Sequence, residues 1–153
     1  MQRRTFLVLT GGPQVIMSSA PALADGSGPQ LASYYDRHLA LLDGVVHGWT
    51  GRGLPVRQRA GVRQVGVGRD AFFALQNDGR LFGWSDAPDS ASLLAPGVGA
   101  FASGQSGWFA VDQAQVLWYG GAKSQTPRRV ADDVVSACIG DSADYYIRRD
   151  GTL

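Results

Sequence analysis

Short runs of alternating apolar residues recur along this chain at a fixed spacing. Each of three runs begins five residues after a glycine, and these glycines, Gly68, Gly104 and Gly140, are 36 residues apart. The phrases read VGVGRDAFFALQNDGRLFGW from Val65, FASGQSGWFAVDQAQVLWYG from Phe101 and CIGDSADYYIRRDGTL from Cys138, and a looser copy, YYDRHLALLDGVVHGW, starts at Tyr34. Alternation with a period of two predicts β-strands. Repeats of this length predict units that bury their apolar faces by stacking on their neighbours.

When the copies are superposed, two rows of positions stay apolar in all four. They are Leu39, Phe73, Phe109 and Tyr145, followed by Leu41, Leu75, Val111 and Ile147. A turn comes next, at Asp43-Gly44, Asp78-Gly79, Gln113-Ala114 and Asp150-Gly151. Asp-Gly between two apolar runs is a strong hairpin signal, because glycine accepts positive φ without steric cost.

The return strands then carry Val46, Leu81 and Val116 and end at Trp49, Trp84 and Tyr119, which we expect to pack between units. A further strand precedes each phrase, as in the stretch from Val134 to Ile139. Each unit thus supplies three or four short strands, the content of one propeller blade. We predict an all-β fold, a partial β-propeller of about three to four blades over residues 34–153, with residues 25–33 as a flexible lead-in.

One further row changes polarity from copy to copy. It holds His38, Phe72, Trp108 and Asp144 and lies directly before the first apolar row. An unpaired aspartate is costly to bury, so these four residues cannot share one buried environment. We therefore expect them to line an exposed rim at the mouth of a turn, where aromatic side chains are favoured anchors for a partner. The alternative is that Phe72 and Trp108 pack against the adjacent blade.

The N-terminal residues predict export from a bacterial cell. Arg3 and Arg4 precede a short apolar stretch, and Ala22-Leu23-Ala24 supplies the small residues of a signal-peptidase site. Arg-Arg-Thr-Phe-Leu also resembles a twin-arginine signal. The run from Thr5 to Thr10 is far shorter than the ~20 residues that span a bilayer. We predict that residues 1–24 are a signal peptide cleaved after Ala24, which leaves a periplasmic or secreted protein without a membrane anchor.

The charge balance argues against nucleic acid as a partner. Fourteen basic and thirteen acidic residues give a net charge of +1, which becomes −1 once Arg3 and Arg4 are removed. No basic stripe of the kind that duplex-binding proteins carry is visible. The single cysteine, Cys138, aligns with Ala102 and Gly66 and reads as a small buried side chain. No metal-ligand cluster or nucleotide loop is found, and we predict no cofactor.

Catalysis has little support in the sequence. His38 is expected to be a rim residue, and His47, aligned with Phe82 and Leu117, a packed histidine. A Ser-His-Asp triad could be assembled from Ser103, His38 and Asp141, but other copies fill these repeat positions with different residues.

These phrases resemble the regulator of chromosome condensation repeat, whose units read as a Val-rich strand, Ala-Gly, His-Ser-Leu-Ala-Leu, an Asp-Gly turn and an aromatic-x-Trp-Gly ending. The matching pieces, from a resemblance that covers roughly Tyr34 to Leu153, are HLALLDGVVHGWT from His38, AFFALQNDGRLFGWS from Ala71 and TPRRVADDVVSACIGDS from Thr126. The family's His-Ser pair is replaced by Ala71-Phe72, Gly107-Trp108 and Ala143-Asp144, and its long Asn- and Gly-rich loop is missing. The compact unit is closer to secreted bacterial propellers of the β-lactamase inhibitory protein type. In those proteins aromatic side chains on one face grip a protein, as Phe72 and Trp108 would here.

A propeller of this family has about seven blades, so the resemblance implies that the chain is truncated, or that a homodimer closes a ring from two halves. The predicted function is an exported protein-binding module that acts through one rim without catalysis. The alternatives are a secreted propeller enzyme, such as a lyase or hydrolase, and a non-functional remnant of a longer repeat protein.

Overall fold

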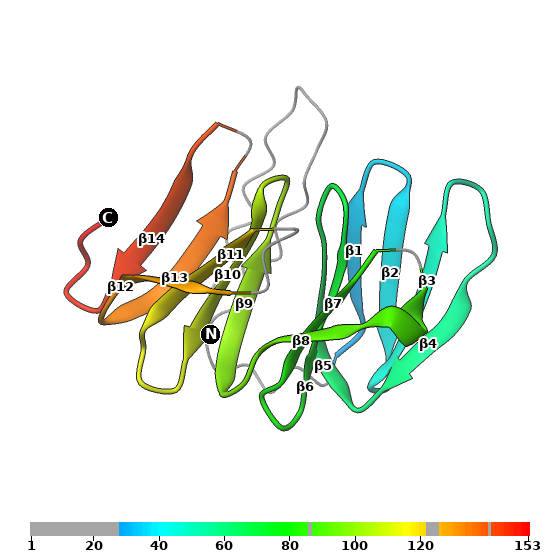
Figure 1. The fold of residues 1–153 in the computed structure, drawn as a ribbon, viewed down its shortest axis with the longest axis horizontal. Helices are drawn as coiled ribbons and strands as arrows, with labels where there is room; N and C mark the ends of the chain where they lie inside the picture. Colours follow the sequence, from blue (N-terminus) through cyan, green and yellow to red (C-terminus); the bar gives the residue numbers. More distant parts are fainter. Residues whose placement is uncertain (1–27, 86, 122–125, 141) are drawn as a thin grey trace, which may run out of the picture.

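The chain folds into four antiparallel β-sheets that stand next to one another like propeller blades (Figure 1). The computed structural model describes residues 28–85, 87–121, 126–140 and 142–153. Within these residues three sheets have four strands and the last has two. The predicted all-β, partial propeller is therefore confirmed. The N-terminal signal predicted for residues 1–24 lies outside the described residues.

In each blade the strands lie in chain order from the inner to the outer edge. The first blade holds β1 (Gln30–Tyr34), β2 (Arg37–Leu42), β3 (Val45–Thr50) and β4 (Val56–Ala60). The second holds β5 (Val62–Val67), β6 (Phe72–Gln76), β7 (Leu81–Trp84) and β8 (Ser92–Ala95), with the short 3-10 helix η1 (Pro88–Ser90) between its last two strands. The third holds β9 (Val98–Ser103), β10 (Gly107–Asp112), β11 (Leu117–Gly121) and β12 (Arg128–Ala131). The fourth holds β13 (Val134–Ile139) and β14 (Asp144–Arg148).

The flexible lead-in was predicted to extend too far along the sequence. We expected residues 25–33 to be flexible, but β1 begins at Gln30 and pairs along its whole length with β2, from Gln30 opposite Leu41 to Tyr34 opposite Arg37. The alternating pattern of β1 is weak, because Leu31 and Ser33 lie on an exposed face and only the other face is packed. Residues 30–33 belong to the first blade.

Each blade buries one face against the blade that follows it. The inner strand β5 packs on β1 and β2, β9 packs on β5 and β6, and β13 packs on β9 and β10. The predicted apolar row fills these interfaces, since Leu39, Phe73 and Phe109 are at most 5% exposed. We call the face of a blade that carries this row its forward face, and the opposite one its backward face.

The repeat glycines Gly68 and Gly104 occupy equivalent turns, where bulk is excluded. The Gly68 amide donates to the carbonyl of Ala71 at 2.8 Å, and the Gly104 amide donates to that of Gly107 at 3.0 Å. A Cβ on Gly68 would stand 2.7 Å from the carbonyl oxygen of Gly104 in the next blade. A side chain at Gly68 would therefore push two blades apart. Gly140 repeats the turn by donating to Ala143 at 3.1 Å.

The hairpin between the second and third strands differs between the first blade and the others. Asp43 and Gly44 alone connect β2 to β3, with φ of 50° and 74°, the type I′ geometry that Asp-Gly favours. The second blade uses three residues, 77–79, with Gly79 at φ 83°. The third blade also uses three, 113–115, with Gln115 at φ 63°, so the shorter turn expected at Gln113-Ala114 was wrong.

Each of these hairpins also holds the next blade through a backbone hydrogen bond. The amides of Val62, Val98 and Val134 lie 36 residues apart and open the inner strands of the second, third and fourth blades. They donate to Gly44, Gly79 and Gln115, the last residue of the preceding blade's hairpin, at 3.0, 2.8 and 2.9 Å. The repeat in the sequence is thus also a repeat of inter-blade bonds.

Side-chain amides reinforce the inner edge. Gln64 on β5 donates to the carbonyl of Phe101 at 2.6 Å and accepts from its amide at 3.3 Å. Gln30, at the equivalent place on β1, donates to Arg63 at 2.8 Å and accepts from Val65 at 3.3 Å. Each glutamine side chain thus pairs with the backbone of the next inner strand.

Candidate functional site

The four residues of the predicted rim do not form one exposed surface. Phe72 and Trp108 are 2% and 0% exposed, so the expectation that they line a rim is wrong. They lie on the backward faces of their blades, where Phe72 joins the core shared with the first blade and Trp108 the core shared with the second. The alternative, packing against the adjacent blade, is what the structure shows.

The other two rim residues lie in different surroundings. His38 is half-buried, stacks on Trp49 with centroids 5.2 Å apart, and has its Nδ1 3.0 Å from the Ser33 hydroxyl. Asp144 is exposed at the start of β14. The members of this row lie in different surroundings, and Asp144 stays exposed although the third blade packs on the fourth. In the first blade no described blade covers the backward face, whereas in the second and third blades one does.

The strand-end aromatics need one correction of register. Leu117 on β11 pairs with Val111 as Leu81 on β7 pairs with Leu75. Gly120, and not Tyr119, is therefore the equivalent of Trp49 and Trp84. Trp84 is 4% exposed and packs between blades as expected. Tyr119 instead donates its hydroxyl to the carbonyl of Ser106 at 3.1 Å and lies below the guanidinium of Arg128, 5.0 Å from the ring centroid.

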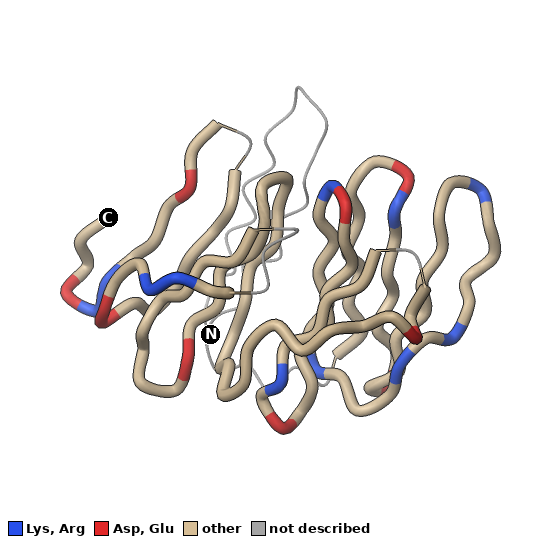
Figure 2. Tube along the Cα trace, in the orientation of Figure 1, with Lys and Arg blue, Asp and Glu red and all other residues tan. Residues whose placement is uncertain are grey.

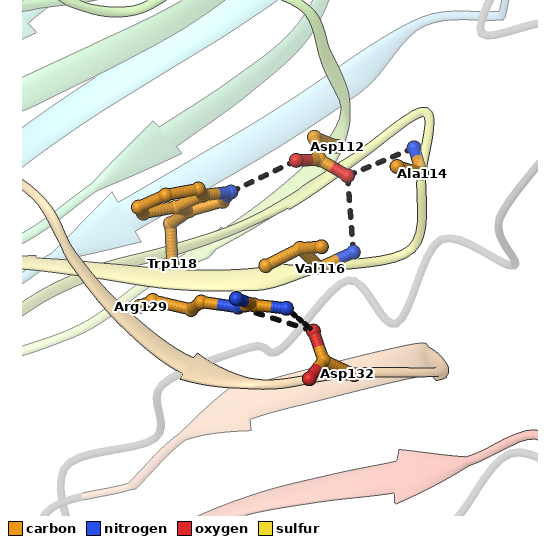
Figure 3. Close-up of polar contacts among 6 residues, drawn as sticks. All are labelled: Asp112, Ala114, Val116, Trp118, Arg129 and Asp132. Atoms are coloured by element: carbon orange, nitrogen blue, oxygen red, sulfur yellow. Dashed lines mark hydrogen bonds and ion pairs between the residues drawn. The ribbon is translucent and has the colours of Figure 1, made fainter.

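The carboxylate of Asp112 accepts three hydrogen bonds and serves a turn (Figure 3). One oxygen of Asp112 accepts from the amides of Ala114 and Val116 at 2.9 and 3.0 Å, and the other accepts from the indole of Trp118 at 2.9 Å. These bonds close the β10–β11 hairpin, which lacks the Asp-Gly of the other copies. A carboxylate so fully engaged has a structural role.

The candidate catalytic residues are held by separate partners. The Ser103 hydroxyl donates to the carbonyl of Val67 at 3.3 Å, while His38 pairs with Ser33. Asp141, the third member considered, lies outside the described residues. Within the described ranges no three His, Cys, Asp or Glu side chains gather where they could hold a metal ion. In the same part of the chain no helix is long and apolar enough to span a membrane.

The best candidate for a binding surface lies where the first and second strands of each blade are joined. This loop face is uppermost in Figure 1 and includes the β1–β2 turn and the β3–β4 loop. The amide of Gly51 in the loop donates to the carbonyl of Asp36 in the turn at 2.6 Å, which fixes the two segments together. Tyr35 and Leu54 project from these segments and are 74% and 84% exposed.

The backbone of Tyr35 is strained. Its φ is 51°, a left-handed value that bulky residues rarely adopt. Residues in such strained conformations cluster at functional sites. They persist only where surrounding contacts hold the backbone in place. Here the turn is braced by Tyr34, which is 6% exposed and meets the Tyr35 ring edge-on with centroids 4.9 Å apart.

One arginine connects the loop face of the first blade to that of the second. Arg37 donates to the carbonyl of Ser85 at 2.8 Å, and its guanidinium lies 5.3 Å from the centroid of the Phe72 ring. Arg52 and Arg69 are exposed on the same end of the blades. Figure 2 shows basic and acidic residues interspersed there, so the surface is mixed in charge. The arrangement is suited to recognising a protein surface.

Solved structures share this architecture, although no protein-family profile and no curated protein sequence matches the chain. Prp20p from Saccharomyces cerevisiae is 17% identical with a TM-score of 0.64, and the match covers 78% of this chain and 43% of that one. A structure of Kap60 bound to yeast RCC1 (Prp20) gives 16% identity and a TM-score of 0.61, covering 79% and 41%. The chain shares the β-propeller fold of these RCC1 structures.

This chain spans about two fifths of the length of those RCC1-type chains. A bacterial protein also matches, namely PorZ, a surface component of the type-IX secretion system of Porphyromonas gingivalis. It has 16% identity and a TM-score of 0.57, and the match covers 76% of this chain and 18% of that one. At these identities the comparison shows the fold, and the closer likeness to secreted bacterial inhibitors stays a prediction.

Little in the sequence marks the loop face. Tyr35 and Leu54 lie in connections that the superposed phrases do not share, so the repeat could not mark them. The available signal was the pair of large apolar residues, Tyr35 and Leu54, in segments rich in glycine and charge.

Proposed function

We propose that this chain is an exported protein-binding module that engages its partner through the loop face of the first two blades. The observation that carries the proposal is the exposure of Tyr35 and Leu54 on two connections locked together by a hydrogen bond. Tyrosine and arginine side chains carry much of the binding energy in protein interfaces, and a rigid support lowers the entropic cost of binding. Arg52 and Arg69 would surround them and favour a partner with carboxylates.

The matched propellers support a binding role. Prp20p was studied for its binding to Gsp1p and histones, and yeast RCC1 was solved with Kap60 bound. Nothing about those particular partners is transferred to this chain. The mechanism proposed here is contact alone, without bond chemistry. Turnover of a substrate that is abolished by His38→Ala would contradict it and favour the enzyme interpretation.

Export is proposed from the two arginines and the Ala22-Leu23-Ala24 site. The test is the N-terminal residue of the protein recovered from the bacterial periplasm or medium. A chain that begins at Asp25 supports cleavage after Ala24. A chain that keeps Met1 and remains in the cytoplasm contradicts export.

The binding test uses substitutions that spare the fold. Tyr35→Asn removes the ring, and asparagine accepts the left-handed backbone better than tyrosine does. Leu54→Ser removes the second anchor from an exposed loop, and Leu93→Ser on β8, where leucine is 48% exposed, is the matched control. Affinity capture with the wild type identifies a partner, whose dissociation constant is then measured for each variant. Loss of at least tenfold in affinity for Tyr35→Asn and Leu54→Ser, with none for Leu93→Ser, is expected. Equal affinity for all four proteins would place the contact elsewhere.

A further inference from the structure

The fourth blade exposes its members of the two apolar rows, which the first and second blades bury. Tyr145 and Ile147 on β14 are 51% and 41% exposed. Their equivalents in the second blade, Phe73 and Leu75, are 1% and 0% exposed because the third blade covers them. The register places Cys138 opposite Tyr145 and Ser136 opposite Ile147, on this same forward face. The fourth blade thus has an exposed apolar forward face, which in the second blade is covered by the next blade.

The first blade exposes the complementary surface. Leu31 and Leu42 are 71% and 47% exposed on its backward face, beside the half-buried ring of Trp49. Position by position, Leu31 corresponds to Val65 and Trp49 to Trp84. Val65 and Trp84 are buried at the contact with the first blade. The backward face of the first blade therefore resembles the backward face of the second blade, which packs on a forward face.

We propose that a second copy of this chain covers these two faces, with the fourth blade of each copy packed on the first blade of the other. Two such contacts related by a twofold axis use both faces of both copies and close the assembly. This inference does not depend on the proposed loop-face function, because neither Tyr35 nor Leu54 lies on these faces.

Backbone groups at the two ends stand in the register of the existing inter-blade bonds. Gly151 is the last residue of a three-residue hairpin, as Gly79 and Gln115 are, and its carbonyl corresponds to theirs. Gly28 precedes Gln30 by two residues, as Val62 precedes Gln64, so its amide is our candidate for the matching donor. A second copy would extend the same hydrogen-bond pattern.

The apolar residues at the proposed contact, Leu31 and Ile147, are unlike the mixed charged residues at the two ends of the sheets (Figure 2).

The experiment is the solution mass of the full chain by light scattering over a wide concentration range. The proposal predicts a two-chain mass for the wild type. Ile147→Glu and Leu31→Glu should each shift the protein to the one-chain mass, because both contacts of a pair are then damaged. Leu54→Glu, at a leucine on the loop face that is more exposed than either position, is the control and should keep the two-chain mass.

A mixture of the two variants tests the head-to-tail geometry. A pair of one Ile147→Glu and one Leu31→Glu chain keeps one undamaged contact, so the mixture should partly regain the two-chain mass. Alkylation of Cys138, the single cysteine, should also slow in the wild type at concentrations where pairs form.

Tyr145→Asp provides a second forward-face variant, and circular dichroism confirms that each variant is folded. A one-chain mass for the wild type at every concentration overturns the proposal. A pair that both glutamate variants retain, or an assembly that grows without closing, overturns it as well.

Discussion

Trp108 on β10 lies directly opposite Gly120 on β11, and its indole covers the place where a side chain on that glycine would stand. In the second blade the same two positions hold Phe72 and Trp84, whose rings stack with centroids 5.9 Å apart. The indole therefore comes from the second strand in one blade and from the third strand in the other. Both arrangements place a tryptophan side chain in the interface between blades. The two tryptophans do not align in the sequence, so the repeat does not reveal their equivalence.

This exchange predicts a paired effect on stability. Gly120→Trp alone should destabilise the fold by several kcal/mol, because the new side chain would occupy the space of the Trp108 indole. Adding Trp108→Phe recreates the pair seen in the second blade and should restore about half or more of the loss. Urea unfolding of the wild type, both single variants and the double variant measures the coupling. Additive effects of the two substitutions would show that the two side chains do not compete.

Substitution of Gly68 is expected to destabilise the fold by steric overlap, although its backbone does not have a positive φ. Gly68→Ala would place a methyl group 2.7 Å from the Gly104 carbonyl oxygen and 3.2 Å from the Phe73 ring. The expected cost is about 1–3 kcal/mol, as for other overpacked sites. Gly28→Ala is the control, since nothing lies within 4 Å of a Cβ there. If thermal unfolding gives equal midpoints for the two variants, the approach of the second and third blades is looser than described.

Substitution of Gln64 is expected to lower the free energy of unfolding, because two backbone groups of Phe101 would lose their hydrogen-bond partner. Gln64→Ala removes both hydrogen bonds to Phe101 and should cost about 1–3 kcal/mol in the free energy of unfolding. Gln113→Ala, in an exposed turn, is the matched control and should change stability by less than about 0.5 kcal/mol. Chemical denaturation distinguishes the two, and similar small effects for both would mean that the inner-edge amide adds no stability.

Two hairpin aspartates predict a loss of stability in acid. The amide of Arg80, and then its guanidinium 2.7 Å away, hold the pKa of Asp78 below its ordinary value of 3.8. The Thr152 amide and hydroxyl lower the pKa of Asp150 in the same way. A pKa that is lower in the folded state gives stability that is present above the unfolded-state pKa and is lost as the pH falls through the folded-state pKa.

The double variant Asp78→Asn, Asp150→Asn should therefore lose less stability than the wild type between about pH 4 and pH 2. Urea midpoints measured across this range for both proteins give the comparison. Identical slopes against pH would contradict the assignment of these carboxylates to the acid response.

The sequence predicted those parts of the fold that repeat. The rows that hold Phe73 and Leu75, and the Asp43-Gly44 turn, follow from side-chain alternation and the backbone freedom of glycine. The register at Gly120 could not be read, because Gln115 takes a left-handed turn position that gives no glycine signal. The setting of Phe72 was missed because the polar residues His38 and Asp144 share its row, and they led us to expect an exposed surface for all four positions.

The inter-blade amides of Val62, Val98 and Val134 give the most direct test that consecutive units pack as blades. Native-state hydrogen exchange should show all three protected to the same degree as Ala74 and Ala110, which lie inside β6 and β10 and are fully buried. Rapid exchange of the three valine amides, with Ala74 and Ala110 still protected, would mean that each sheet forms but does not dock on the next.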